Sequence, residues 1–162
     1  MFVSRVKGCI NLNTALRKQL HRGHGAGNIM KTLTIAGGLQ ELAAMRRFVT
    51  EALEDAPVSP KEKADLKFCF MEAVLNAIKH GNAGDPAKEI RISVEIAEDS
   101  IFFRVEDRGD GFDINDIPDP TSPERLEHET GRGVFFMLKL MDEVKTEKTD
   151  FGFAVSLNKF ID

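Results

Sequence analysis

Apolar and polar residues alternate in several stretches of this chain, as expected for strands with one buried face. The clearest stretch runs from Ile90 to Ile96, and an acidic turn at residues 98–100 leads from it into another. The pattern predicts strands over residues 31–36, 90–96, 101–106, 143–149 and 153–158. Residues 150–152 lie between the last two strands and are predicted to form a hairpin turn.

Other apolar residues recur at helical spacing and predict three helices. These helices cover residues 39–53, 60–80 and 133–141. Ser59 suits the N-cap of the second helix, and Pro60 suits its first turn. This order of strands and helices favours an α/β, or α+β, fold: a two-layer sandwich of a mixed β-sheet with its helices on one face.

The first 29 residues differ in composition from the rest. They contain five Lys and Arg residues and a cluster of glycines at residues 23–27, but no acidic residue. Such a composition is typical of a mobile terminal segment. We therefore predict a basic, disordered arm over residues 1–29 and one compact domain over residues 30–162.

The overall composition narrows the class of partner. The formal charge is -4 at pH 7, and no basic stripe of the kind that binds nucleic acid is present. The two cysteines, Cys9 and Cys69, match neither a disulfide framework nor a metal site. No apolar run is long enough to span a bilayer. We expect a cytoplasmic protein whose partners are proteins or small molecules, with no direct contact to nucleic acid or membrane.

Glu72 and Asn76 lie four residues apart on the polar strip of the second predicted helix. An exposed pair on a solvated helix edge is the commoner reason for this spacing alone. The functional interpretation is a wall of a metal–nucleotide site, in which the Asn76 amide oxygen binds Mg²⁺ and Glu72 orients or deprotonates an attacking hydroxyl. Two glycine motifs downstream favour the functional interpretation.

The first glycine motif, at residues 107–111, ends a predicted strand with the carboxylate of Asp107. Its glycines leave room for a planar ring to approach the backbone, although an ordinary hairpin turn has similar residues. The second motif, Gly131-Arg132-Gly133, opens a helix, where free N–H groups and the positive helix end bind phosphate. An ordinary junction of loop and helix is the alternative there.

In this order, the three segments resemble the nucleotide-binding boxes of the ATPase superfamily of gyrase and histidine kinases. The Glu-x-x-x-Asn-Ala-x-x-His-Gly wording of residues 72–81 resembles the anti-sigma factor serine/threonine kinases of bacterial partner-switching systems. The resemblance covers about residues 31–159. It implies a histidine-kinase-like ATPase (Bergerat) fold that binds ATP or ADP with Mg²⁺, with residues 113–130 as a lid.

The resemblance also implies roles for single residues. Glu72 would be the general base, Asn76 the Mg²⁺ ligand and Asp107 the acceptor that reads the adenine amino group. The other implied nucleotide-binding residues are Gly109 and Gly111 beside the base, and Gly131, Arg132 and Gly133 at the phosphates.

One departure from the resembled family lies in the last strand. Relatives have a Gly-Thr pair there, whose threonine supports the adenine-reading aspartate, whereas this chain has Gly152-Phe153. The departure implies that the base pocket is remodelled and weaker, or that a water molecule takes the place of the threonine.

A domain of this size has room for neither the phosphoacceptor hairpin of a histidine kinase nor a transducer domain, so we expect it to act on another protein. The resemblance implies a kinase that sequesters a sigma factor and phosphorylates a serine or threonine of an anti-sigma factor antagonist. The alternative is a non-catalytic module in which ATP stabilises a partner-binding conformation. A homodimer formed through residues 31–36 and the following helix is implied as well. The sequence identifies neither the sigma factor nor the antagonist.

Overall fold

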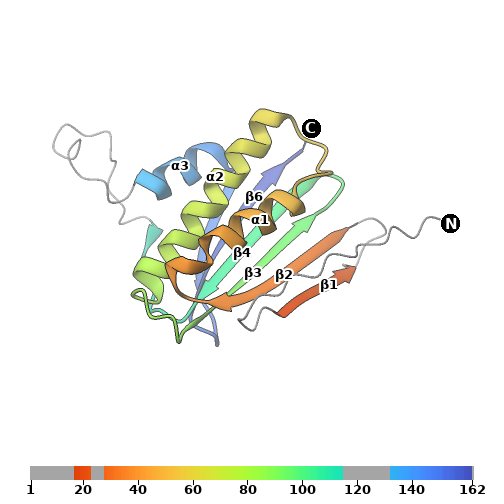
Figure 1. The fold of residues 1–162 in the computed structure, drawn as a ribbon. Coiled ribbons are helices and arrows are strands. Elements are labelled where there is room, and N and C mark those ends of the chain that lie inside the picture. The colour runs from red at the N-terminus through yellow and green to blue at the C-terminus, as the bar shows by residue number, and fades with distance from the viewer. Residues whose placement is uncertain (1–16, 23–27, 115–131, 162) are drawn as a thin grey trace.

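The computed structural model describes residues 17–22, 28–114 and 132–161, which form a six-stranded sheet with helices packed on it (Figure 1). The strand order is β1-β2-β3-β4-β6-β5. The strands are β1 (Arg17–Arg22), β2 (Ile29–Ala36), β3 (Glu89–Ile96), β4 (Ser100–Asp107), β5 (Glu143–Lys148) and β6 (Phe153–Phe160). All five predicted strands are present, each within two residues of its expected bounds at either end.

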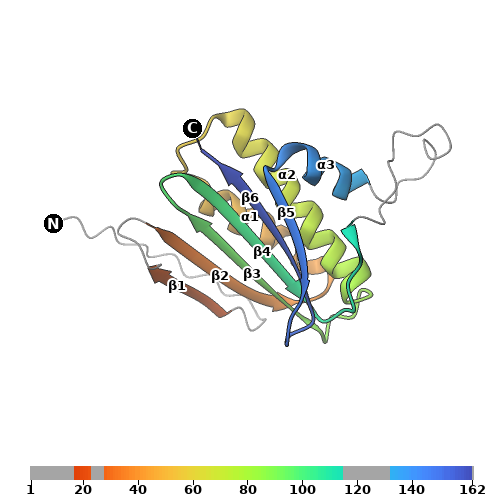
Figure 2. The same ribbon diagram turned by 180° about the vertical axis from the view of Figure 1, so that it is seen from behind.

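Three α-helices cover one face of the sheet, and Figure 2 shows the sheet in front of them when the molecule is seen from behind. They are α1 (Leu42–Ala52), α2 (Pro60–Asn76) and α3 (Arg132–Leu140), with a 3-10 helix η1 (Leu39–Glu41) before α1 and a π-helix η2 (Ala77–Gly81) after α2. The predicted two-layer α+β class with helices on one face is confirmed. None of the helices in the described ranges has the length and hydrophobicity needed to cross a membrane.

The hydrophobic core fills the space between the sheet and the helices. Ile90, Ile92 and Val94 of β3 all point into this core and are buried. The alternating apolar residues that predict the strand are thus the ones that pack it against the helices. The rings of Phe70 on α2 and Phe103 on β4 are fully buried, with centroids 5.4 Å apart. Burial of these apolar side chains stabilises the fold and fixes α2 over the sheet.

The sequence predicts a mixed sheet, with both parallel and antiparallel strands. In the structure, every described pair of neighbouring strands is antiparallel. A short turn joins β3 to β4, with the Ala97 N–H donating to the Ser100 carbonyl (2.9 Å), and Thr149 and Gly152 close the hairpin between β5 and β6. Connections this short join only antiparallel strands. The hairpin predicted at residues 150–152 is confirmed.

Strand β1 lies within the segment that the composition leads us to expect as a disordered arm. It runs along β2, from Arg17 opposite Thr34 to Arg22 opposite Ile29, and adds an edge strand to the sheet. The structure therefore differs from the expected arm at these six residues. A sheet edge pairs through backbone N–H and C=O groups, so the basic composition of a segment does not prevent it from joining. The domain boundary at residue 30 stays a prediction.

Candidate functional site

Helix α2 carries the first pair of predicted site residues. It begins with a capping box, in which the Glu62 N–H donates to Ser59 Oγ (3.2 Å) and the Ser59 N–H donates to the Glu62 carboxylate (2.7 Å). Pro60 occupies the first turn, and the predicted N-cap at Ser59 is confirmed. From this fixed start, Glu72 and Asn76 follow one turn apart, and both are half-buried.

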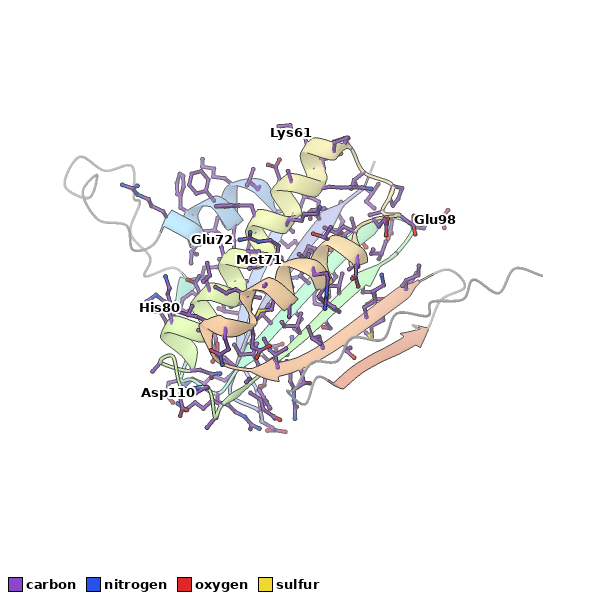
Figure 3. The ribbon with its side chains drawn as sticks, in the orientation of Figure 1. Lys61, Met71, Glu72, His80, Glu98 and Asp110 are labelled. Carbon is purple, nitrogen blue, oxygen red and sulfur yellow. The ribbon has the colours of Figure 1, made fainter. Side chains whose placement is uncertain are left out.

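Glu72 lies against the first turn of α3 (Figure 3). A Cβ atom added to Gly133 would overlap the Glu72 Oε2 atom, so a larger residue there would displace the carboxylate. The positive end of the α3 dipole stabilises a negative charge at this place. The fold thus brings the predicted base together with one of the predicted phosphate-binding glycines.

Helix α2 widens after Asn76 into the π-helix η2. The Asn82 N–H donates to the Ala77 carbonyl, five residues earlier (2.7 Å), so this turn contains one residue more than an α-helical turn would. Ala83 and Gly84 then take left-handed conformations, with φ of 55° and 72°, and the chain turns toward β3. The sequence predicts one continuous helix up to residue 80, because apolar spacing does not distinguish a single π-turn from an α-turn.

The side chain of Asn82 is fully buried and holds three segments together. Its Oδ1 accepts from the Arg108 N–H (2.8 Å), and its Nδ2 donates to the carbonyls of Lys88 and Glu89 (3.3 Å each). These bonds link the end of η2 to the start of β3 and to the residue that follows Asp107. Asn82 is missing from the predicted site, although its position directly after the His-Gly pair of the first motif is a signal for it.

Asp107 ends β4, and only 5% of the residue is exposed. Its Oδ1 accepts a hydrogen bond from the Gly109 N–H (2.7 Å). Burial raises the pKa of Asp107, while the Gly109 N–H and the charge of Lys88 act in the opposite direction. A Cβ atom on Gly81 would overlap the carboxylate. Gly81 is therefore a second site residue that the prediction lacks, although the His-Gly pair of the first motif contains it.

The turn after Asp107 packs closely against its surroundings. A Cβ atom on Gly109 would lie 2.5 Å from a carbonyl oxygen of η2, and one on Gly111, whose φ is 80°, would overlap the Phe153 ring. Phe153 is paired with Asp107 in the sheet, and its ring packs against Phe112 with centroids 5.5 Å apart. An apolar ring therefore stands where relatives are expected to have threonine.

The predicted residues fall into two clusters near the end of α2. Glu72 and Gly133 form the first cluster, and the turn of residues 107–111 against η2 forms the second. Figure 3 labels Glu72 in the first cluster and Asp110 in the second. Asn76 is the last residue of α2, so along the chain it lies between Glu72 of the first cluster and η2, which the second cluster contacts.

The structure describes only part of the predicted phosphate end. Arg132 is the first residue of α3, and its side chain is exposed. Gly131 and residues 115–130 of the expected lid lie outside the described residues.

Asn76 is the predicted Mg²⁺ ligand. Within the described part of the chain, no group of three or more His, Cys, Asp and Glu side chains is arranged to hold a metal ion. A Mg²⁺ ion that accompanies a nucleotide takes most of its ligands from phosphates and water, and only one or two from the protein. The amide oxygen of Asn76 is a hard donor of the kind that this ion prefers. The residues present therefore fit such an ion.

Residues 35–159 match the family described as "Histidine kinase-like ATPase domain", and this range contains every predicted site residue. Three relatives are each named serine-protein kinase RsbW. The chain is 37% identical over 103 residues to that of Bacillus licheniformis, 35% over 103 residues to that of Oceanobacillus iheyensis and 31% over 129 residues to that of Listeria innocua.

The alignments cover 60% of this chain and 64% of the Bacillus protein, 60% and 65% for the Oceanobacillus protein, and 76% and 75% for the Listeria protein. The chain thus spans less than two thirds of the first two relatives. The family match covers most of this chain. The chain therefore belongs to the histidine kinase-like ATPase domain family and is a relative of the serine-protein kinases RsbW.

Proposed function

We propose that this chain is an ATP-dependent protein serine/threonine kinase that sequesters a sigma factor and phosphorylates an anti-sigma factor antagonist. Its family and the names of its relatives support this proposal. The observation that carries it is the position of the Glu72 carboxylate against Gly133 in the first turn of α3. A protein that only binds nucleotide needs donors and a metal ligand near the phosphates, but has no need of a carboxylate there.

The second cluster binds the adenine base in this proposal. The Asp107 carboxylate, fixed by the Gly109 N–H, accepts a hydrogen bond from the adenine amino group. Guanine has a carbonyl oxygen at the same place, which an ionised carboxylate repels. Gly109 and Gly111 have no side chains and line the base. The chain should therefore prefer adenine nucleotides to guanine nucleotides.

The first cluster binds the phosphates and the ion. Backbone N–H groups at Gly131 and Gly133, with the Arg132 guanidinium, donate to phosphate oxygens at the positive end of α3. The Asn76 amide oxygen would hold Mg²⁺, and the ion, when bound, would supply positive charge near the transferred phosphoryl group.

Glu72 acts as the general base on the hydroxyl of the protein substrate. A serine or threonine of the antagonist donates its proton to the Glu72 carboxylate while its oxygen attacks the γ-phosphorus of ATP. The new P–O bond forms on the antagonist, the bond to the β,γ-bridging oxygen breaks, and ADP leaves. The half-buried position of Glu72 beside α3 holds the base close to the phosphate end of the site.

Replacement of the base tests this mechanism. Glu72→Gln keeps the size of the side chain but removes its basicity, so we expect normal ATP binding and phosphoryl transfer to the antagonist reduced by about 10²- to 10⁴-fold. Asn76→Ala should lose Mg²⁺-dependent ATP binding as well as transfer. Labelled ATP and calorimetry measure the two properties, and Glu54→Gln, at an exposed site, is the control.

Two outcomes would contradict the kinase. Full transfer by Glu72→Gln would remove Glu72 from the mechanism. Absence of label from the antagonist with the unaltered chain would leave the alternative, a module in which ATP only stabilises the conformation that binds a partner. The apolar Phe153 opposite Asp107 is the observation that favours this alternative.

We also propose a homodimer, in which β2 and the segment after it form one composite surface for the sigma factor. Leu39 in η1 is 53% exposed and belongs to this region. We expect Leu39→Asp to shift the sedimentation coefficient from dimer to monomer at micromolar concentration and to leave ATP binding intact. A monomer before substitution would refute the dimer. The cytoplasm is the proposed location.

A further inference from the structure

The ring of Phe151 lies against two arginine side chains. The guanidinium carbon of Arg108 is 3.6 Å from the ring centroid, and that of Arg91 is 3.8 Å from it. Both guanidinium groups therefore contact the same ring. Phe151 is only 9% exposed, whereas both arginines are exposed, so each cation–π interaction has the strength typical of an exposed site.

The hairpin that carries Phe151 is fixed against the end of β4. Thr149 Oγ1 accepts from the N–H groups of Phe151 and Gly152 (3.2 Å each), and Thr149 and Gly152 also pair through their backbones. A Cβ atom on Gly152 would overlap the carbonyl oxygen of Asp107. The tip of the hairpin therefore touches the residue that is proposed to read adenine.

Arg108 contacts Phe151 through its side chain and is joined to Asp107 by a peptide bond. Its N–H donates to Asn82 Oδ1 (2.8 Å), and its Nη1 donates to the Phe151 carbonyl (3.3 Å). Its guanidinium also lies 3.7 Å from the Glu89 carboxylate. The peptide after Asp107 is thus held by its backbone on one side and by the Arg108 side chain on the other.

We propose that Phe151 is a positioning residue of the nucleotide site: through Arg108 it fixes the end of β4 and so the direction of the Asp107 carboxylate. This rests on the proposed adenine-reading role of Asp107. The side chain of Phe153, which is paired with Asp107 in the sheet, has no polar atom that can hold the carboxylate. The ring against Arg91 and Arg108 supplies that support from the neighbouring turn instead.

Substitution of the ring gives the first test. Phe151→Leu keeps an apolar side chain but loses both cation–π interactions, so we expect the Kd for Mg·ATP, measured by calorimetry, to rise about 3- to 30-fold. The preference for ATP over GTP should fall with it, because a loosened carboxylate discriminates less well. Phe151→Tyr should restore both values, and Phe160→Leu, an exposed phenylalanine at the other end of β6, should change neither.

Arg108→Gln gives the second test and leaves the buried ring in place. If Phe151 acts through Arg108, this variant should weaken ATP binding about as much as Phe151→Leu, and the double variant should be no weaker than either single one. Independent, additive losses would overturn the proposal. If Phe151→Leu does not fold, Arg108→Gln alone still gives a test, because normal ATP binding and a normal preference for ATP over GTP in that variant would overturn the proposal.

Asp107→Asn separates this proposal from the proposed function. If Asp107→Asn loses ATP binding while Phe151→Leu and Arg108→Gln bind ATP normally, the positioning role is overturned and the nucleotide site stands. If Asp107→Asn binds ATP as tightly as the unaltered chain, the site itself is wrong, and the positioning role is overturned with it.

Discussion

An aspartate lies near each end of strand β6, and the two differ in burial and in the direction of their pKa shift. At the start of β6, Asp107 is 5% exposed, and burial raises its pKa more than the Gly109 N–H and Lys88 lower it. At its far end, Asp142 is exposed and accepts from the Phe160 N–H (2.7 Å) and Lys159 Nζ (3.0 Å). Burial acts to raise the pKa of Asp142 too, but these two partners lower it overall.

The comparison separates a functional end from a stabilising end. An ionised Asp107 costs stability, because the fold keeps its charge away from water. An ionised Asp142 adds a little stability, because its partners favour the charged form. Unfavourable burial of a charge, as at the Asp107 end of β6, is expected where the protein holds a carboxylate ready for a ligand.

The largest expected effect comes from the buried amide that fixes the Asp107 end. Asn82→Ala leaves the Arg108 N–H and the carbonyls of Lys88 and Glu89 without their partner. We expect it to lower the free energy of unfolding by about 3 kcal/mol, measured by urea denaturation. Asn28→Ala, which removes one half-buried bond to Glu95, is the control and should cost about 1 kcal/mol or less. Equal losses would break the comparison.

Gly81→Ala should have the next largest effect, and the effect should be on binding. Its methyl group would overlap the Asp107 carboxylate, so we expect the carboxylate to move, the affinity for ATP to fall at least about 10-fold, and stability to fall by about 1–3 kcal/mol. Gly84→Ala is the control for a glycine three residues away that does not touch Asp107. Gly84 has a positive φ of 72°, but open space surrounds it, so the variant should lose about 1 kcal/mol of stability through backbone strain and bind ATP normally.

At the opposite end, Ser59→Ala removes the side chain that caps α2. We expect a loss of about 1 kcal/mol of unfolding free energy and no change in ATP affinity. Ser59→Asp retains an N-cap acceptor and should recover most of the loss. A change in ATP affinity on Ser59→Ala would show that the two ends are coupled.

The smallest effects are in the pH dependence, where the two aspartates should have opposite signs. The native state binds the Asp107 proton more tightly than the unfolded chain does, so the contribution of Asp107 to stability falls as pH rises from about 3.9 to its raised native pKa. Asp142 contributes stability that is lost as pH falls from about 3.9 to its lowered native pKa, by about 0.5 kcal/mol or less at this exposed site.

Substitution isolates these two contributions. The free energy of unfolding of Asp107→Asn, relative to the unaltered chain, should therefore rise with pH. That of Asp142→Asn should fall with pH. Urea denaturation from pH 3 to pH 7 measures both, and the same direction for both variants would refute the comparison.

Local chemistry made much of the fold predictable. Ser59 and Pro60 set the start of α2, and the alternation of Ile90, Ile92 and Val94 sets the buried face of β3. Asp107 and Gly133 could be selected because their motifs follow one another at a recognisable spacing. Each of these signals lies within a few residues of the feature it predicts.

Features that depend on contacts distant in sequence were not predictable in the same way. The pairing of β1 with β2 depends on the availability of a sheet edge, and the antiparallel direction of β6 depends on where the chain returns after α3. The position of Phe151 against Arg91 and Arg108 joins residues of three different segments. No spacing along the sequence indicates such a contact.

The π-helix η2 makes the length of the segment between Asn76 and Asn82 more important than the identity of its exposed residues. An α-helix turns about 100° per residue, so loss of one residue from this segment would rotate Asn82 away from β3 and the end of β4. Lys79 and His80 are exposed, and substitutions there leave that angle unchanged. Over evolutionary time, the exposed positions of this segment should therefore accept many substitutions, whereas the segment as a whole should reject single-residue insertions and deletions.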